Sequence, residues 1–159
     1  QVDKEALIMD TRWNGGGWLH DDLAKLLSGT DYSWAVPRGK QVGKEPQNRW
    51  TKPVVLVMGE ANYSDAHFFP YAYTALNIGK TVGMPIPGTA TAVWWENLLD
   101  PSLVFGMPMV GVKNTDGEFL ENNQLEPDYR VKNDPESIAK GRDKQIDKAV
   151  EVLLEQLDQ

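Results

Sequence analysis

Cysteine is absent from this sequence, and histidine occurs only at His20 and His67. Without cysteine the chain can form neither a disulfide bond nor a thiolate metal site. Two imidazoles offer little material for a zinc centre, which combines several such ligands, so we expect no metal site and no cofactor. Composition leaves the compartment open, because cysteine-free chains occur in the cytosol and in the periplasm alike.

An excess of positive charge is lacking as well. The chain carries 16 Lys and Arg against 23 Asp and Glu, which gives a formal net charge of −7 at pH 7. Proteins that bind nucleic acid need a clustered basic surface, so we expect no nucleic-acid partner.

Long apolar runs are also missing. None approaches the roughly 18 residues of a membrane-spanning helix, and we expect no membrane insertion.

What is present suits one α/β domain spanning residues 1–159. A chain of 159 residues, 41% of them hydrophobic, can bury roughly 68–70% of its unfolded surface. Short buried-strand patterns alternate with helical ones, as in layered α/β domains. Strands are expected at residues 6–11, 53–58, 81–84, 91–95 and 107–112, and helices at 19–27, 64–77 and 146–157. The long connection 28–52 indicates a functional loop.

Ser64 lies between a buried apolar strand, residues 53–58, and the helix that follows. A serine there has free backbone N–H groups and the positive end of a helix dipole beside its hydroxyl, which suits a nucleophile in acyl transfer. The alternative is that Ser64 or Asp65 only caps the helix.

The glycines at 15–17 follow another expected strand. They can point N–H groups at a developing negative charge, or they can form only a tight turn.

Two further side chains could take part in chemistry, and each also has a plain structural explanation. Glu121 follows Gly117 closely and could be a functional acid or a solvated loop carboxylate. His67 stands three residues after Ser64, on a neighbouring face of the expected helix. It could serve as a base, but a hydrogen-bonded structural histidine is the commoner outcome.

The order of these segments resembles the S41 peptidases, and within them the tricorn branch. The signature D-x-R-x-N-G-G-G at 10–17, a serine 47 residues after its last glycine, and the sequence L-E-N at 120–122 with a later P-D occur in that order. The resemblance runs from residue 6 to residue 157. It implies the C-terminal catalytic subdomain of such a protease, a layered β-sheet flanked by helices of the ClpP and crotonase type.

The resemblance also implies roles for particular residues. Ser64 would be the nucleophile, the backbone N–H groups of Gly17 and Asp65 the oxyanion hole, and Glu121 the acid that supports the catalytic array. The substrates would be peptides or oligopeptides. The sister branch pairs its serine with a lysine further along the chain. Because no lysine occurs between Lys80 and Lys113, a tricorn-like histidine base is favoured.

That histidine comes from an upstream segment in the tricorn branch, and neither histidine of this chain stands at its position. A serine without a base is a poor nucleophile at neutral pH, so we expect the chain alone to be inactive and its parent to be a serine peptidase. The opening at Gln1 rather than Met also favours part of a longer protein. The resemblance implies upstream propeller and PDZ-like domains, a homo-oligomer and a cytoplasmic location, although a periplasmic or secreted protein fits the composition too.

The resemblance implies that the loop containing Trp34 and Ala35 forms part of the pocket that sets substrate preference. In tricorn an acidic residue at the corresponding place favours basic side chains, whereas counting from Gly17 gives Ala35 here, with Asp31 four residues away. An apolar pocket is therefore expected.

Two alternatives to a peptidase remain: a crotonase-like acyl-CoA enzyme, and a non-catalytic module of the same fold. In that module aromatic side chains would line a ligand cavity, namely Trp94, Trp95, Phe105 and Phe119.

Overall fold

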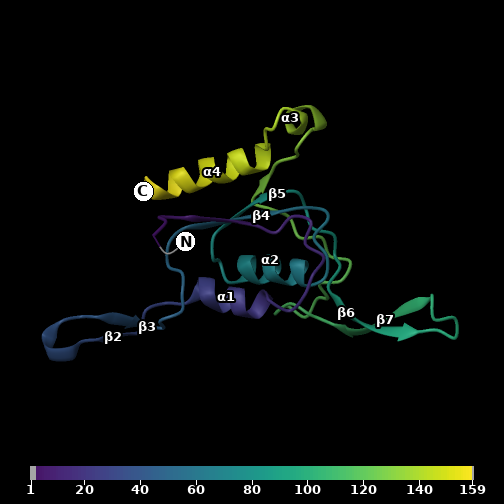
Figure 1. Ribbon diagram of the computed structural model, residues 1–159, viewed down its shortest axis with the longest axis horizontal. Coiled ribbons are helices and arrows are strands. Elements are labelled where there is room, and N and C mark those ends of the chain that lie inside the picture. The colour runs from purple at the N-terminus through teal and green to yellow at the C-terminus, as the bar shows by residue number, and fades with distance from the viewer. Residues whose placement is uncertain (1–2, 159) are drawn as a thin grey trace.

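The computed structural model describes residues 3–158 and has a parallel β-sheet between two layers of helices (Figure 1). The sheet contains four strands in the order β1–β4–β5–β8, and each neighbouring pair is parallel. Their bounds are Leu7–Asp10 for β1, Val54–Met58 for β4, Lys80–Gly83 for β5 and Tyr129–Arg130 for β8. The layered α/β class expected from the sequence is confirmed.

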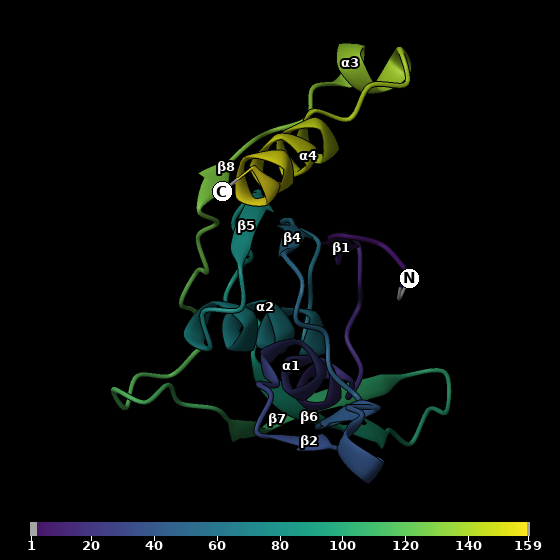
Figure 2. The same ribbon diagram turned by 90° about the vertical axis from the view of Figure 1, so that its left-hand side faces the viewer.

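Three helices cover the two faces of this sheet (Figures 1 and 2). Helices α1, His20–Ser28, and α2, Asp65–Ala75, lie on one face, and α4, Lys144–Leu157, lies on the other. The strands advance in one direction from β1 through β4 to β5, so right-handed crossovers place α1 and α2 on the same face. A short helix, α3, Pro135–Ala139, precedes α4.

Strand β4 forms the centre of the core, and all five of its residues are buried. Val54 and Leu56 pack with residues of α1 and α2, whereas Val55 and Val57 pack with residues of α4. Successive strand side chains point to opposite faces, and here both faces are covered. That is why β4 is a continuous apolar run rather than an alternating one.

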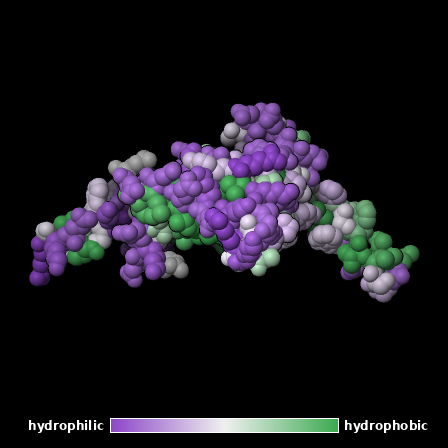
Figure 3. Space-filling view, turned by 90° about the horizontal axis from the view of Figure 1, so that it is seen from above, coloured by the Kyte–Doolittle hydropathy of each residue, from purple (hydrophilic) through white to green (hydrophobic). Residues whose placement is uncertain are grey.

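Two antiparallel hairpins extend from opposite ends of the molecule (Figure 1). One pairs β2, Ser33–Ala35, with β3, Gly43–Glu45, and encloses a short 3₁₀ turn at Pro37–Gly39. The other pairs β6, Thr91–Asn97, with β7, Val104–Gly111. Figure 3 shows hydrophobic residues gathered at the β6–β7 end, where exposed side chains include Trp94, Leu99 and Phe105.

The expected elements are present at nearly the expected places. The three longer helices and all five expected strands occur, with ends that differ from the expected ones by at most three residues. The stretch 28–52 was expected to be a loop, but it contains the β2–β3 hairpin, and the short elements β8 and α3 were not expected. Within residues 3–158 no helix is both long enough and apolar enough to cross a membrane.

Candidate active site

The glycine motif and Ser64 meet because their strands are neighbours in the sheet. Strands β1 and β4 pair in parallel, with Asp10 opposite Val57. The segments that follow them therefore leave the same, carboxyl-terminal edge of the sheet. In α/β proteins this edge is where ligands bind. Residues 47 or more apart in the sequence are thus brought into one site.

Ser64 occupies a sharp turn between β4 and α2. Its backbone angles are φ 56° and ψ −120°, a region that a residue with a side chain rarely adopts and that costs of order 1–3 kcal/mol. Although Ser64 stands at the N-cap position, its hydroxyl makes no capping hydrogen bond with the helix. A strained strand-to-helix turn that exposes a serine hydroxyl is the geometry of a nucleophile elbow.

Gly16 packs directly against this turn. A Cβ atom placed on Gly16 would lie 2.8 Å from Ser64 Cβ and 3.0 Å from the Tyr63 carbonyl oxygen, and its φ is +107°. The backbone N–H of Tyr63 donates to the Asn14 carbonyl oxygen at 3.0 Å. The Asn14 side-chain oxygen in turn accepts from the Gly16 N–H at 2.8 Å. Only glycine allows the two segments to approach this closely.

Two backbone N–H groups remain free beside the serine. Within residues 3–158, neither the Gly17 N–H nor the Asp65 N–H donates a hydrogen bond. Both residues line one cavity with Ser64, of about 590 Å³. Unpaired N–H groups next to a hydroxyl can stabilise the negative charge that develops on a carbonyl oxygen during acyl transfer.

The Asp65 side chain reaches back to the start of α1. Its Oδ2 accepts hydrogen bonds from the backbone N–H groups of Leu19, at 2.9 Å, and His20, at 3.2 Å. Its Oδ1 pairs with His20 Nδ1. The sequence suggested the Asp65 backbone as an oxyanion donor, or its side chain as a cap of the helix that follows. No local pattern indicates that its carboxylate caps a helix 45 residues earlier.

His20 lies in the same cavity as Ser64. Since Nδ1 faces the Asp65 carboxylate, the ring proton belongs on Nδ1. The ring packs against Phe68 with centroids 5.5 Å apart. In the described part of the chain no hydrogen bond joins the His20 ring to the Ser64 hydroxyl. His20 was not singled out as a site residue from the sequence.

Glu121 is bonded to the wall of the cavity rather than placed inside it. Its Oε2 accepts from the Ala90 N–H at 2.8 Å and from the Thr91 hydroxyl at 2.7 Å. Thr91 lines the cavity, whereas Glu121 does not. No hydrogen bond to Oε1 of Glu121 occurs within residues 3–158, so this oxygen is available to a further donor.

His67 is a structural histidine. It is 1% exposed, and its Nδ1 accepts a hydrogen bond from the Thr89 N–H at 3.3 Å. Burial lowers the pKa of His67 because it disfavours the charged ring, although the negative charge of Glu121 opposes this shift. His67 is not among the residues that line the Ser64 cavity.

Trp34 and Ala35 lie far from this site. Both belong to β2, in the hairpin at the opposite end of the molecule from β6–β7 (Figure 1), and neither lines the Ser64 cavity. The apolar wall of the cavity comes instead from α2, the glycine segment and the β6–β7 hairpin. Its side chains are those of Trp18, Phe68, Ala92, Val93, Trp95, Val110 and Val112.

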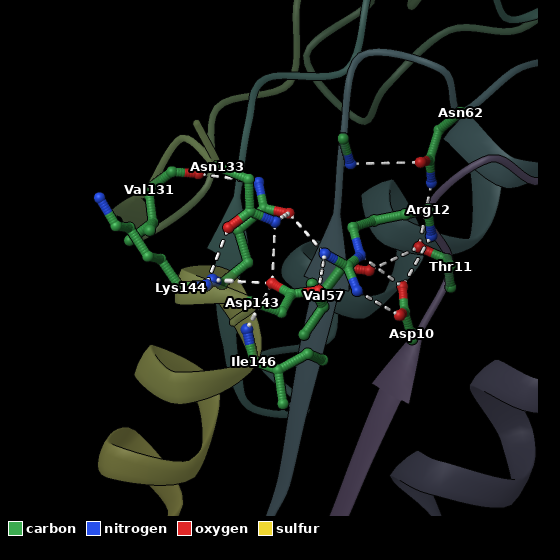
Figure 4. A network of polar contacts seen from close by, with 12 residues as sticks. Asp10, Thr11, Arg12, Val57, Asn62, Val131, Asn133, Asp143, Lys144 and Ile146 are labelled. Atoms are coloured by element: carbon green, nitrogen blue, oxygen red, sulfur yellow. Dashed lines mark hydrogen bonds and ion pairs between the residues drawn. The ribbon is translucent and has the colours of Figure 1, made fainter. Parts of the chain in front are cut away.

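A polar network supports the carboxyl-terminal end of β1 (Figure 4). Arg12 forms ion pairs with Asp10 at 2.7 Å and with Asp143, just before α4, at 2.8 Å. The hydrogen bonds that Arg12 donates to the Asp10 carboxylate are the main cause that raises the pKa of Arg12, and Asp143 contributes further. Asn62 donates to the Thr11 hydroxyl at 3.0 Å and so links β1 to the loop before Ser64. The network holds the glycine motif to the core.

Comparison with known proteins agrees with this geometry. The sequence model of one protein family, Peptidase family S41, matches residues 1–131. Tricorn protease homolog 1 of Streptomyces coelicolor is 31% identical over 160 residues, which cover 100% of this chain and 15% of that protein. Tricorn protease of Thermoplasma acidophilum is 27% identical over 154 residues, 96% of this chain and 14% of that protein.

Solved structures show the same fold. The crystal structure of the tricorn protease superposes with a TM-score of 0.85 at 26% identity and covers 98% of this chain and 15% of that one. A putative peptidase from Parabacteroides merdae has the same fold, with a TM-score of 0.72 at 24% identity over 96% of this chain and 53% of that one. The chain thus spans about 15% of the length of the first curated relatives it matches. With the family match over most of its length, this chain belongs to peptidase family S41.

Proposed function

We propose that this chain is the single catalytic subdomain, residues 1–159, of a longer serine peptidase, and that Ser64 is its nucleophile. The observation that carries the proposal is the strained Ser64 turn. Its hydroxyl makes no capping hydrogen bond and lies in one cavity with two free N–H groups. A helix-capping serine needs neither the strain nor the free donors. Upstream propeller and PDZ-like domains and a homo-oligomer are part of the same proposal.

The reaction would be peptide hydrolysis through an acyl-enzyme. A base takes the proton from Ser64 Oγ as Oγ attacks the peptide carbonyl carbon, and the N–H groups of Gly17 and Asp65 stabilise the oxyanion. The tetrahedral intermediate collapses as the leaving amine takes the proton. Water then attacks the ester carbon while the base takes a proton from it, and the base returns this proton to Ser64 Oγ as the acid product leaves.

The base would be a histidine from another part of the protein. His67 is buried against Thr89, and in the described part of the chain no hydrogen bond joins the His20 ring to the Ser64 hydroxyl. Glu121 has one carboxylate oxygen, Oε1, without a partner in the part of the chain that the structure describes. We propose that this oxygen accepts a hydrogen bond from the incoming imidazole and so orients it, the task of the acid in a catalytic triad.

The substrate would be a peptide with an apolar side chain next to the scissile bond. The cavity wall is largely apolar and includes Phe68 and Trp95. Asp65 carries the only carboxylate among the described residues of this lining, and that carboxylate is occupied by His20 and Leu19. A basic substrate side chain would therefore find no free partner. Trp34 and Ala35 would contact a substrate only across an oligomer, from the hairpin of a neighbouring copy.

Fluorophosphonate labelling of the full-length protein and of this chain, with the modified residue mapped by mass spectrometry, tests the proposal. We expect labelling at Ser64 in the full-length protein, little or none in the chain alone, and none in a Ser64→Ala variant. Labelling in neither form would contradict the peptidase proposal. It would favour the ligand-binding module, although of the four aromatic side chains expected to line its cavity only Trp95 lines the Ser64 cavity, and Trp94, Phe105 and Phe119 are exposed.

A further inference from the structure

The two free N–H groups beside Ser64 belong to segments that only tertiary contacts hold together. Gly17 lies in the segment after β1, and Asp65 is the first residue of α2. A backbone donor stabilises an oxyanion only when its N–H is held in place before the reaction. Gly17 itself has no atom within 4 Å of its Cβ position and has a φ of +151°. Its orientation must therefore be set by the residues on either side.

Bonds between the two segments bracket Gly17. On the N-terminal side, the Asn14 carbonyl accepts from the Tyr63 N–H, and Gly16 touches the Ser64 turn. On the C-terminal side, the Asp65 carboxylate accepts from the Leu19 and His20 N–H groups and pairs with the His20 ring. We propose that Asp65 and His20 form a clamp that positions the Gly17 N–H relative to the Asp65 N–H. This inference rests on the proposed function of Ser64.

The physical chemistry of the clamp favours a rigid contact. The Asp65 side chain is 10% exposed, so its charge is poorly solvated and needs all three of its donors. Hydrogen bonds to an ionised carboxylate are about twice as strong as neutral ones. The carboxylate also faces the N-terminus of α1, where the helix dipole favours negative charge. Helix α1 has no cap from its own N-cap residue, Leu19, so Asp65 takes that place.

In this arrangement Asp65 has two separate tasks. Its backbone N–H would bind the oxyanion, and its side chain would hold the other donor in position. His20 acts through Asp65 as a positioning residue, with its Nδ1–H bonded to Oδ1. An asparagine at position 20 offers an amide N–H near the place of Nδ1 but cannot accept a proton from Ser64. The variant His20→Asn therefore separates positioning from proton transfer.

The test compares Asp65→Ala, Asp65→Asn, His20→Ala and His20→Asn in the full-length protein, with kcat and KM measured on a peptide substrate. Loss of one oxyanion donor lowers the rate by about 10²–10³; a displaced donor should cost less. We expect Asp65→Ala and His20→Ala to lower kcat by about 10-fold to 100-fold with KM nearly unchanged, as for an interaction made in the transition state. Asp65→Asn and His20→Asn should recover most of kcat.

The variant Asp22→Ala is the matched control, because it removes an exposed carboxylate from the first turn of the same helix. We expect it to leave kcat unchanged. If His20→Asn is as inactive as His20→Ala while both remain folded, His20 is a proton acceptor and the clamp is wrong. An Asp65→Ala enzyme with unchanged kcat would also overturn it.

Hydrogen exchange separates this inference from the proposed function. If Ser64 is unreactive in the wild-type protein, the peptidase proposal fails, but the clamp can still be measured at the backbone N–H groups of Leu19 and His20. Asp65→Ala should accelerate exchange at both, while Asp22→Ala should not. Equal exchange in the wild-type protein and in Asp65→Ala would contradict the clamp whatever the enzyme does.

Discussion

At the residue scale, the site depends on backbone geometry more than on side-chain chemistry. Ser64 is held at φ 56°, a conformation that persists only where the surroundings enforce it. The Gly16 segment supplies much of that enforcement, since it fits against Ser64 and Tyr63 with no room for a Cβ atom. The same contact brings Gly17 to the cavity. Substitution at Gly16 should therefore affect both stability and reactivity.

We predict that Gly16→Ala lowers the free energy of unfolding by about 1–3 kcal/mol, because alanine is strained at φ +107°. It should also lower the rate of Ser64 labelling by about 10²-fold, as expected when a reacting group is displaced by about 1 Å. Gly15→Ala is the control, since nothing lies within 4 Å of its Cβ position. Equal labelling of both variants would show that the Gly16 contact does not hold the serine turn.

Buried His67 gives a second prediction at this scale. Its pKa is lowered by burial, while in the unfolded chain it lies near the ordinary value of about 6.5. Between these two pKa values the unfolded chain binds a proton that the folded chain does not. The free energy of unfolding should therefore fall as pH drops below about 6.5 and should stop falling below the folded pKa.

Urea unfolding between pH 5 and pH 7.5 measures this effect in the wild-type protein and in His67→Asn. The amide oxygen of asparagine can accept from the Thr89 N–H in place of Nδ1, but it does not titrate. We expect a shallower pH dependence in the variant. Because His20 is retained in both proteins, parallel pH curves would mean that His67 contributes nothing to the dependence.

At the scale of elements, strand β4 contributes to the two hydrophobic clusters that lie on opposite faces of the sheet. Its alternate residues face α1 and α2 on one side and α4 on the other, so each helix layer is fastened to the same strand. Helix α4 buries a stripe made of Ala149, Val152 and Leu153. The segment just before it also carries Asp143, the ion-pair partner of Arg12. Packing of α4 thus supports the glycine motif from the far face of the sheet.

We predict that Leu153→Ala lowers the free energy of unfolding by about 2–5 kcal/mol, the usual cost of a cavity in a packed core. Leu154→Ala, one residue later, should change it by less than about 1 kcal/mol, because Leu154 is 56% exposed whereas Leu153 is 7% exposed. Urea unfolding of both variants measures the difference. Similar losses would indicate that the outer face of α4 is also buried in solution.

At the scale of the whole molecule, the parts of the proposed catalytic site are not all in contact. The proposed nucleophile and both proposed oxyanion donors lie in one cavity, whereas in the described residues neither histidine ring forms a hydrogen bond with the serine hydroxyl. The β6–β7 hairpin that walls the cavity projects from the body with apolar side chains exposed (Figure 3). The proposed parent peptidase would supply the base to this side of the chain.

We predict that peptidase activity appears when this chain is mixed with a version of the parent protein that lacks only this region, provided the two parts dock. Ser64 without a base should give little or no turnover in the chain alone. A fluorogenic peptide assay measures the result, with a Ser64→Ala chain as the control that should remain inactive after mixing. If the isolated chain is as active as the full-length protein, the base lies within it.

Much of the fold and part of the site could be predicted from the sequence because they depend on local patterns. The apolar run of β4 and the helical stripe of α4 each mark an element without reference to the rest of the chain. The motif at residues 10–17 and Ser64 were each expected to follow a strand, and the structure pairs those two strands in parallel. The β2–β3 hairpin was missed because its three-residue strands are too short to show a period.

The sequence by itself therefore determined the layered α/β class, the family and the residues that could be nucleophile and donors, since apolar periodicity and motif spacing are properties of the chain. Only the tertiary structure decided that the Asp65 carboxylate holds the start of α1, that His67 is buried and that Trp34 and Ala35 lie far from the Ser64 cavity. These facts depend on contacts between distant segments. Each such contact is set by how the helices and hairpins pack on the sheet, which no local pattern records.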